Sequence, residues 1–507
     1  MIAISYLLYN FMLLLGSPLI ALYLVQRYVS GKSRPGWAQR WGRLPEALRF
    51  TPNGKPRLWV HAVSAGEVVA AVPILRELRE TLPEYDILLS VLTPAGMEMA
   101  EQQAKAYTNG LFYFPFDLPW VARRVVNWIR PQVFISLESE MWPNVLHELK
   151  RTNSRMVMVN GRISDKNFKR SSGMGGGLFR WMLNNMDRLL MQSEADAARI
   201  RSLGSFSEDS ARVSVLGNSK FDQAIAPLST EEVLELRREL GLPEDAPVFV
   251  AGSTRSPEED AQIIAAYKIM RETCENLFLI IAPRQINRAD ELQEAMQAAG
   301  IEARKRTEPT PPAPLPDSFA AHHREGGVKS PPSLAKRSER PGKGAGGLGL
   351  ILDTMGELAN VYAVATIAFV GNSFAPVVKG GGQNLLQPLA HGKPVFFGPH
   401  TATIRSEVAL VTQAGVGFRV LDAAELAREG SCLLHNEAAR NQIEKNALEL
   451  IRANRGVSAR YAAEVAKLAR EAGHPSPEKP SSNRQRAAHS PQPPSPKKAW
   501  EEGENKL

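Results

Sequence analysis

The sequence of 507 residues has little cysteine and lacks the short motifs of several common enzyme classes. Cys274 and Cys432 are its only cysteines and lie far apart, so there is neither a disulfide framework nor a cysteine-based metal-ligand spacing. No Walker phosphate loop, no H-E-x-x-H, no G-x-S-x-G and no G-x-G-x-x-G after the first predicted strand is present. Hydride transfer, phosphoryl transfer from ATP and serine hydrolysis are therefore disfavoured.

The net charge of +8 is unevenly distributed along the chain. The basic excess lies in the first 50 residues, in residues 304–350 and after residue 474, and the rest of the chain is mildly acidic. A broad footprint on a nucleic-acid backbone is therefore not expected. With 44% apolar and 22% charged residues, the rest of the sequence is typical of a globular protein with a sizeable core.

An apolar run without any charged residue extends from Ile2 to Val25. It is about long enough to cross a bilayer as one helix. A cleaved signal peptide is the alternative, but the run lacks preceding basic residues and a clear small-x-small cleavage site. We therefore predict a membrane anchor over residues 1–27, which Pro18 could kink so that the helix dips into one leaflet. The downstream chain is expected on the cytoplasmic side because basic residues follow the run: Arg27, Lys32 and Arg34.

Short apolar runs alternate with amphipathic stretches from residue 57 onward, in two series separated by the polar segment 224–230. Strands that alternate with helices in this way imply parallel sheets covered on both faces. We therefore predict an α/β protein with two doubly wound lobes facing across a cleft. The predicted strands are Arg57–Val63, Asp86–Leu92, Val133–Leu137, Met156–Asn160 and Arg188–Gln192, then Val248–Ala251, Leu277–Ala282, Gly349–Leu352, Ile367–Val370 and Pro394–Phe397.

The lobes are predicted to span residues 28–225 and 230–473. Residues 304–348 interrupt the second lobe and residues 474–507 follow it. Both segments are dense in Pro, Gly, Ser and charged residues, which cannot bury enough apolar surface to fold. Both are therefore predicted to be disordered.

Polar residues stand at the ends of several predicted strands, where active sites of such sheets lie. By position alone, Glu67 suits a helix-capping role and Lys220 a solvated linker. Burial of Glu138 would be costly unless it pairs or acts chemically. Arg284 follows an apolar strand, a good position for gripping a phosphate. The glycines of residues 380–382 would let backbone amides approach a phosphate, although a glycine triplet alone is weak evidence.

Taken together and in order, nine motifs resemble the Kdo (3-deoxy-D-manno-octulosonic acid) transferases of lipopolysaccharide synthesis. The resemblance extends from the anchor to about residue 460 and is specific because the motifs keep their order and rough spacing. They are Arg40-Trp-Gly-Arg43, Ser64-Ala-Gly-Glu67, Glu138-Ser-Glu-Met-Trp-Pro-Asn144, Ser219-Lys-Phe-Asp222, Pro283-Arg284, Asp353-Thr-Met-Gly-Glu-Leu358, Ala368-Phe-Val-Gly371, Gly381-Gly-Gln-Asn384 and Gly398-Pro-His400.

The resemblance implies a GT-B fold whose first lobe binds the acceptor and whose second lobe binds the donor, CMP-Kdo. It implies inverting transfer to the lipid A precursor (lipid IVA) at the cytoplasmic face of the inner membrane, without a metal or cofactor. Glu67 would be the general base, and Glu138 and Lys220 would assist the transition state. CMP would be held by Pro283, Arg284, Met355, Gly356, Glu357, Asn384, Leu385, Leu386 and Gln387.

The first of these motifs follows the anchor, and we expect Arg40, Trp41 and Arg43 to contact the acceptor. Simple attraction of this basic stretch to anionic membrane lipids is an equally good interpretation. Gln387 departs from the family, which usually has a glutamate there to accept hydrogen bonds from the nucleotide ribose. Glutamine keeps an acceptor oxygen but not the charge, so weaker donor binding is expected.

Two other functions remain open at this point. The chain could be another membrane-associated GT-B transferase that uses a different nucleotide sugar. It could also be a catalytically impaired protein that binds lipid or nucleotide. The change at Gln387 slightly favours impairment, whereas the presence of Glu67, Glu138, Lys220 and Arg284 argues against it.

Overall fold

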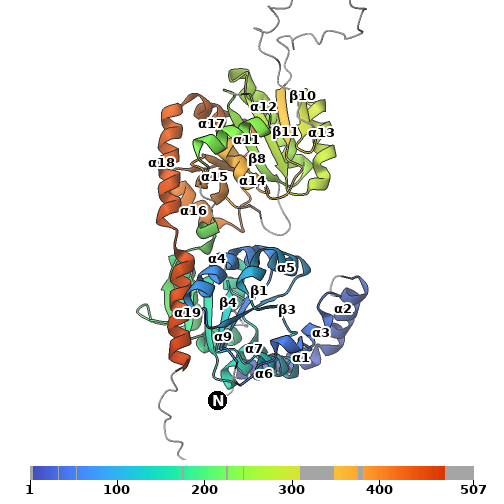
Figure 1. Ribbon diagram of the computed structural model, residues 1–507, viewed down its shortest axis with the longest axis vertical. Coiled ribbons are helices and arrows are strands. Elements are labelled where there is room, and N and C mark those ends of the chain that lie inside the picture. The colour runs from blue at the N-terminus through green and yellow to red at the C-terminus, as the bar shows by residue number, and fades with distance from the viewer. Residues whose placement is uncertain are drawn as a thin grey trace, which may run out of the picture.

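The computed structural model describes residues 4–31, 34–52, 54–173, 176–223, 227–243, 245–308, 347–374 and 381–473. Two α/β lobes are stacked along the long axis of the molecule (Figure 1). Most of the interruption predicted in the second lobe, and the whole predicted tail from residue 474, lie outside the described residues.

The first lobe is built on a parallel seven-stranded sheet with the order β3-β2-β1-β4-β5-β6-β7. Strand β1 alternates between two cores, as the two-residue period of a strand requires. Leu58 and Val60 pack on the side of α4, and Trp59 packs on the opposite side. The strands are β1 (Arg57–Ala62), β2 (Asp86–Val91), β3 (Gly110–Tyr113), β4 (Val133–Leu137), β5 (Arg155–Gly161), β6 (Arg188–Met191) and β7 (Val213–Val215).

Helices cover both faces of this sheet, as the alternating pattern predicts (Figure 1). They are α4 (Ala65–Thr81), α5 (Pro94–Met99), α6 (Pro119–Ile129), α7 (Pro143–Arg151), α8 (Asp165–Ser172), α9 (Gly176–Asn185) and α10 (Glu194–Gly204). Shorter turns of helix are η1 (Glu46–Leu48), η2 (Ala100–Ala104), η3 (Lys105–Tyr107) and η4 (Ser219–Gln223).

The second lobe repeats the design with a parallel seven-stranded sheet of order β10-β11-β9-β8-β12-β13-β14. One apolar core runs through this lobe. Its strands are β8 (Val248–Thr254), β9 (Phe278–Pro283), β10 (Ile301–Lys305), β11 (Gly347–Ile351), β12 (Ile367–Val370), β13 (Val395–Phe397) and β14 (Gly417–Arg419). Its helices are α11 (Thr230–Glu239), α12 (Pro257–Thr273), η5 (Ile286–Arg288), α13 (Ala289–Ala298), α14 (Leu358–Val361), η7 (Tyr362–Val364), α15 (Leu386–Ala390), α16 (Arg405–Gln413), α17 (Ala423–His435) and α18 (Glu437–Ala453).

The last described helix, α19 (Val457–Gly473), returns to the first lobe. Val457, Tyr461 and Val465 belong to the same apolar cluster as β1 and α4. The second lobe was predicted to continue to residue 473, whereas its packing ends with α18. The amphipathic pattern of α19 predicts a helix but does not say which lobe its apolar face covers.

The apolar N-terminal run forms two helices, α1 (Ile4–Leu15) and α2 (Ser17–Val29), and the short α3 (Trp37–Arg40) follows. No single helix of the described chain is long and apolar enough to span a bilayer, but α1 and α2 together meet that test with a bend of 62°. The break falls at Gly16 and just before Pro18, two poor helix formers. The bend agrees with the kink that the sequence analysis allowed at Pro18 and divides the predicted anchor segment into a bent pair of helices.

Candidate active site

Each sheet changes winding direction at one place, between β1 and β4 in the first lobe and between β8 and β12 in the second. In doubly wound sheets, ligands bind at the carboxyl ends of the strands next to such a switch point. Glu67 follows β1 and Glu138 follows β4, so two of the three residues predicted to act in catalysis flank the switch point of the first lobe.

Glu67 lies in the first turn of α4, after the N-cap residue Ser64. One of its carboxylate oxygens accepts the Val63 N–H at 2.8 Å, and the other accepts the Ser64 hydroxyl at 3.0 Å. The capping role expected from its position is therefore present. Each oxygen still has a free lone pair with which to accept a proton.

Burial and the nearby negative charge of Glu138 raise the pKa of Glu67 to about 7. Such a carboxyl is poised to exchange a proton near neutral pH, as a general base must. Perturbed carboxyls at a cleft are candidates for catalysis on physical grounds. Glu140 follows in the same turn, and burial together with Glu138 raises its pKa.

The backbone at Glu138 has φ of 54°, in the left-handed region that residues other than glycine rarely adopt. Its N–H is held by the carbonyl of Val159 on the neighbouring strand at 3.0 Å. A strained conformation that the surrounding structure imposes is common at functional sites. Here it turns the chain sharply at the end of a buried strand, next to Glu67.

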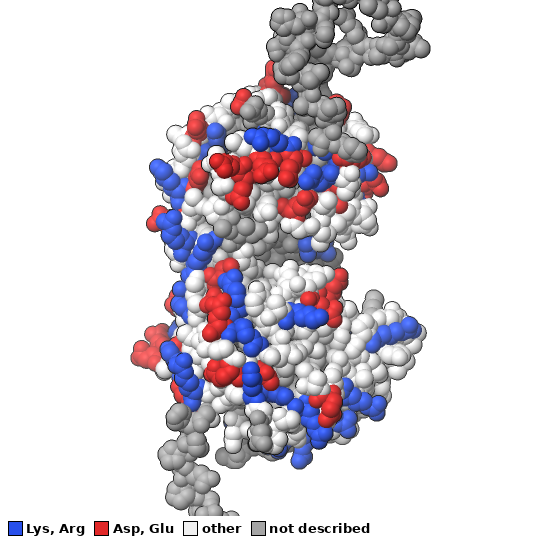
Figure 2. Space-filling model, viewed as in Figure 1, with Lys and Arg blue, Asp and Glu red and all other residues white. Residues whose placement is uncertain are grey.

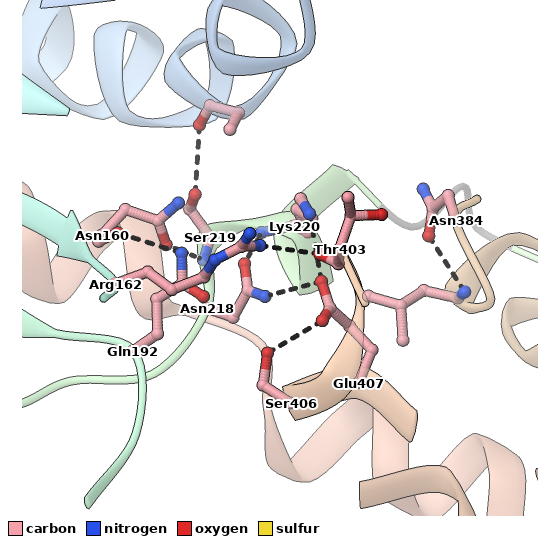
Figure 3. Close-up of polar contacts among 12 residues, drawn as sticks. Asn160, Arg162, Gln192, Asn218, Ser219, Lys220, Asn384, Thr403, Ser406 and Glu407 are labelled. Atoms are coloured by element: carbon pink, nitrogen blue, oxygen red, sulfur yellow. Dashed lines mark hydrogen bonds and ion pairs between the residues drawn. The ribbon is translucent and has the colours of Figure 1, made fainter. Parts of the chain in front are cut away.

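Lys220 projects from η4 toward the second lobe, where its ammonium lies 3.0 Å from a carboxylate oxygen of Glu407 (Figure 3). Glu407 stands in the first turn of α16 and is only 3% exposed. Burial alone would raise the pKa of Glu407, but the charge of Lys220 and hydrogen bonds outweigh it and lower the pKa. Sequence reasoning missed Glu407, because nothing in the pattern of α16 separates it from an ordinary amphipathic helix.

The other residues of the η4 motif connect three parts of the molecule. The Ser219 hydroxyl donates to the carbonyl of Ala70 in α4 at 3.1 Å, and Phe221 is buried in the core of the second lobe. The Asp222 carboxylate accepts the N–H groups of Gly456 and Ser458 and so caps α19. This turn is therefore the point at which the two lobes and the returning helix meet.

A buried carboxylate, that of Glu259, lies at the switch point of the second lobe. Glu259, in the first turn of α12, is 1% exposed and accepts the N–H of Arg255 at 2.9 Å. It also accepts the N–H groups of the turn after β12, from Asn372, Ser373 and Phe374, at 2.8 to 3.1 Å. Glu259 therefore holds the turn after β12 in place.

The residues predicted to hold CMP follow strands of this second sheet. Arg284 comes after β9 and is exposed, and its guanidinium has no hydrogen-bond or ion-pair partner among the described residues. The turn after β11 contains Met355, which is 71% exposed, and Gly356 with φ of 92°. Glu357 accepts a hydrogen bond from Thr354 and lies 3.5 Å from the guanidinium of Arg306.

The glycine-rich motif is described only from Gly381 onward. A Cβ on Gly381 would stand 2.1 Å from the carbonyl oxygen of His400, so only glycine fits there. The Asn384 side chain accepts the Leu386 N–H at 2.9 Å and starts α15. Leu385 and Leu386 are buried, so only their backbone can face a nucleotide, whereas Gln387 is half-buried and its side chain has no partner among the described residues.

The three residues predicted to contact the acceptor separate in the structure. Arg40 is 5% exposed, donates to the carbonyl of Leu92 at 2.6 Å and stacks over Tyr113. This arrangement supports the local fold and leaves little of Arg40 to meet a ligand. Trp41 and Arg43 instead line a surface cavity of about 380 Å³. The other residues that line it are Trp37, Ala38, Trp120 and Arg124.

Two doubly wound lobes with switch points at the carboxyl ends of their strands define the GT-B class of fold. A UDP-GlcNAc 2-epimerase from Neisseria meningitidis superposes with a TM-score of 0.51 at 11% identity, over 81% of this chain and 99% of that one. A glycosyltransferase from Rickettsia africae superposes with a TM-score of 0.50 at 10% identity, over 83% of this chain and 100% of that one. At these identities the likeness concerns the fold alone.

Sequence relatives are more specific. A family model described as 3-deoxy-D-manno-octulosonic-acid transferase (kdotransferase) matches residues 35–223. The 3-deoxy-D-manno-octulosonic acid transferase of Bordetella pertussis is 30% identical over 393 residues, 76% of this chain and 81% of that relative. The enzyme of the same name from Haemophilus influenzae is 27% identical over 456 residues, 88% and 95% of the two chains.

A bifunctional glycosyltransferase/methyltransferase of Fusobacterium nucleatum is 30% identical over 375 residues, 73% of this chain, but the match spans only 51% of that relative. The chain belongs to the 3-deoxy-D-manno-octulosonic acid transferase family and is a glycosyltransferase. The resemblance recognised from the nine motifs is confirmed.

Proposed function

We propose that this chain transfers Kdo from CMP-Kdo to the phosphorylated lipid A precursor, with inversion and without a divalent metal. Family membership supports the transferred sugar. The observation that carries the proposal is Glu67, a carboxyl with a pKa of about 7 at the switch point of the first lobe, beside Glu138.

The reaction needs a base because a sugar hydroxyl is a poor nucleophile until its proton is removed. In the proposed step, the acceptor oxygen forms a bond to the anomeric carbon of Kdo while Glu67 takes the hydroxyl proton. The bond from that carbon to the phosphate oxygen of CMP breaks, and CMP leaves with the electron pair. A single displacement of this kind inverts the anomeric centre.

The leaving group gains negative charge on the phosphate as this bond breaks. Fixed cations that meet the developing charge stabilise the transition state. Arg284, exposed after β9 and without a partner among the described residues, is one such cation. Lys220 is the second, and Glu407 occupies only one of its three N–H donors among the described residues. We propose that these two positive charges stabilise the leaving phosphate, as a divalent metal does in other transferases.

The acceptor is proposed to arrive from the inner membrane, on the side of the first lobe that carries the apolar helix pair. Most of the large apolar side chains of α1 and α2 are exposed, among them Phe11, Leu15 and Leu22. Basic side chains gather near α6 at the lower right of Figure 2. Trp120 lies among them and is 64% exposed. Exposed tryptophan beside arginine suits the headgroup region of a membrane.

Purified protein incubated with CMP-Kdo and the lipid A precursor should release CMP and add the mass of Kdo to the lipid. UDP-sugars offered in place of CMP-Kdo should give no product, and the reaction should continue after a chelator is added. Transfer from a UDP-sugar alone would replace the proposal by a different GT-B activity. The absence of any transfer, with CMP bound normally, would favour a binding protein.

A further inference from the structure

We propose that Glu407, on the donor lobe, is a positioning residue for Lys220, so that the catalytic arrangement is complete only when the two lobes meet. This inference rests on the proposed function, because it assigns a partner to a residue of the proposed site. It starts from a carboxylate in α16 that is almost fully buried and faces across the gap between the lobes.

Both carboxylate oxygens of Glu407 accept hydrogen bonds. One oxygen accepts Lys220 at 3.0 Å and the Asn218 amide at 3.2 Å. The other accepts the Ser406 hydroxyl at 2.8 Å (Figure 3). Removal of a buried charge of this kind costs far more than the loss of an exposed ion pair, because the partner left behind is unpaired.

Asn218 connects the same carboxylate to the backbone of Lys220. Its side-chain oxygen accepts the Lys220 N–H at 3.0 Å while its amide donates to Glu407. Ser219, next in the chain, is fixed to the first lobe through Asn160 and through α4, the helix that begins with Glu67. The main chain of Lys220 is therefore set by the first lobe, and its ammonium by the second.

A second contact between the lobes lies close by and serves as an internal control. Arg405, two residues before Glu407, forms an ion pair with Asp165 of the first lobe. Both of these side chains are far more exposed than Glu407, at 62% and 42%. Arg162 also donates to the carbonyl of Thr403 across the gap, at 2.8 Å. Of these three contacts between described residues, the one made by Glu407 reaches a residue of the proposed site.

The test compares Glu407→Gln, Lys220→Gln and the double variant with Arg405→Gln, which breaks an inter-lobe ion pair without touching Lys220. Glu407→Gln should lower kcat about ten- to hundred-fold, the range for losing a hydrogen bond between charged groups. The KM for the lipid acceptor should change little. In the Lys220→Gln background, Glu407→Gln should cause no further loss, because its effect acts through Lys220. Arg405→Gln should stay within about two-fold of the parent.

A parent-like kcat for Glu407→Gln, or a loss that adds fully to that of Lys220→Gln, would overturn the inference. Thermal unfolding of each variant separates a folding defect from a kinetic one. If Glu407→Gln does not fold, Glu407→Asp keeps the charge but draws it back from Lys220, and it must lower kcat more than Arg405→Gln does. If the parent protein transfers no Kdo at all, the proposed function fails instead.

Discussion

Glu67 and Glu259 occupy the same place in the two lobes, yet their surroundings differ. Each is the third residue of the helix that follows the first strand of its lobe, behind a serine N-cap, and each accepts the N–H four residues before it. Glu259 also accepts three N–H groups from the turn after β12. At the equivalent turn after β4, the negative charge of Glu138 lies near Glu67 and repels it.

The glutamate at this equivalent position therefore has a different role in each lobe. In the second lobe, the carboxylate is saturated with hydrogen bonds and stabilises the turn after β12. In the first lobe, the carboxylate accepts fewer hydrogen bonds from the described residues, and burial together with nearby like charges raises its pKa. The turns that the two carboxylates meet are also related, since Glu138 and Asn372 follow corresponding strands and both have left-handed backbones, with φ of 54° and 59°.

Glu67→Gln should abolish transfer and, above neutral pH, stabilise the protein. Because folding raises the pKa of Glu67 from 4.5 to about 7, this carboxyl favours the folded state below pH 4.5 and loses that contribution as pH rises through 7. The neutral variant should thus match the parent at pH 4 and exceed it by roughly 1–3 kcal/mol at pH 8. Urea unfolding at both pH values checks this. Equal stability at pH 8 would show that the carboxyl is not perturbed.

Glu138→Gln should move the acidic limb of the pH profile of kcat/KM to lower pH. Glu67 must be ionised to accept a proton, so activity should rise with pH through about 7 in the parent. Removal of the charge of Glu138 lowers the pKa of Glu67, by up to roughly one unit. Glu140→Gln is the matched control and should shift the limb less, because its charge has the smaller effect on Glu67. An unshifted limb in Glu138→Gln would mean that the two carboxylates do not interact.

Glu259→Gln should destabilise the second lobe without changing the pH profile of catalysis. In the parent protein these backbone N–H groups point at a carboxylate, and the substitution places an amide N–H against them. A loss of about 2–4 kcal/mol in the free energy of unfolding is expected for a buried, charge-assisted network. Glu258→Gln, at an exposed neighbouring position, should be close to neutral. A Glu259→Gln protein as stable as the parent would remove the structural role assigned to this carboxylate.

Gln387→Glu should tighten donor binding. The side chain of Gln387 is half-buried and has no partner among the described residues, so a carboxylate there would be available to the ribose hydroxyls of a nucleotide. A charged acceptor makes a stronger hydrogen bond than a neutral one, and about a ten-fold lower Kd for CMP is expected. Calorimetric titration of CMP into both proteins measures it. An unchanged Kd would mean that this residue does not meet the ribose.

The central strands could be predicted from the sequence, but the outermost strands could not. The four that were missed are β3, β7, β10 and β14, and each lies at an edge of its sheet. An edge strand has one neighbour and one less protected side, so it can be short and polar, as in Ile301–Lys305. The central strands are buried on both faces and therefore appear as continuous apolar runs.

The sequence by itself determined the class of fold, the family, and which residues stand at strand ends, because these follow from local periodicity and from motif order along the chain. The distribution of charge also follows from the sequence alone. The tertiary structure decided what surrounds each of those residues. Packing placed Glu67 near the negative charge of Glu138, whereas it gave Glu259 a full set of hydrogen bonds. It also buried Arg40 and paired Lys220 with Glu407. The last described helix, α19, packs on the first lobe. Val68 of α4 and Val465 of α19 share one core although they are 397 positions apart, and no local pattern specifies a partner at that separation.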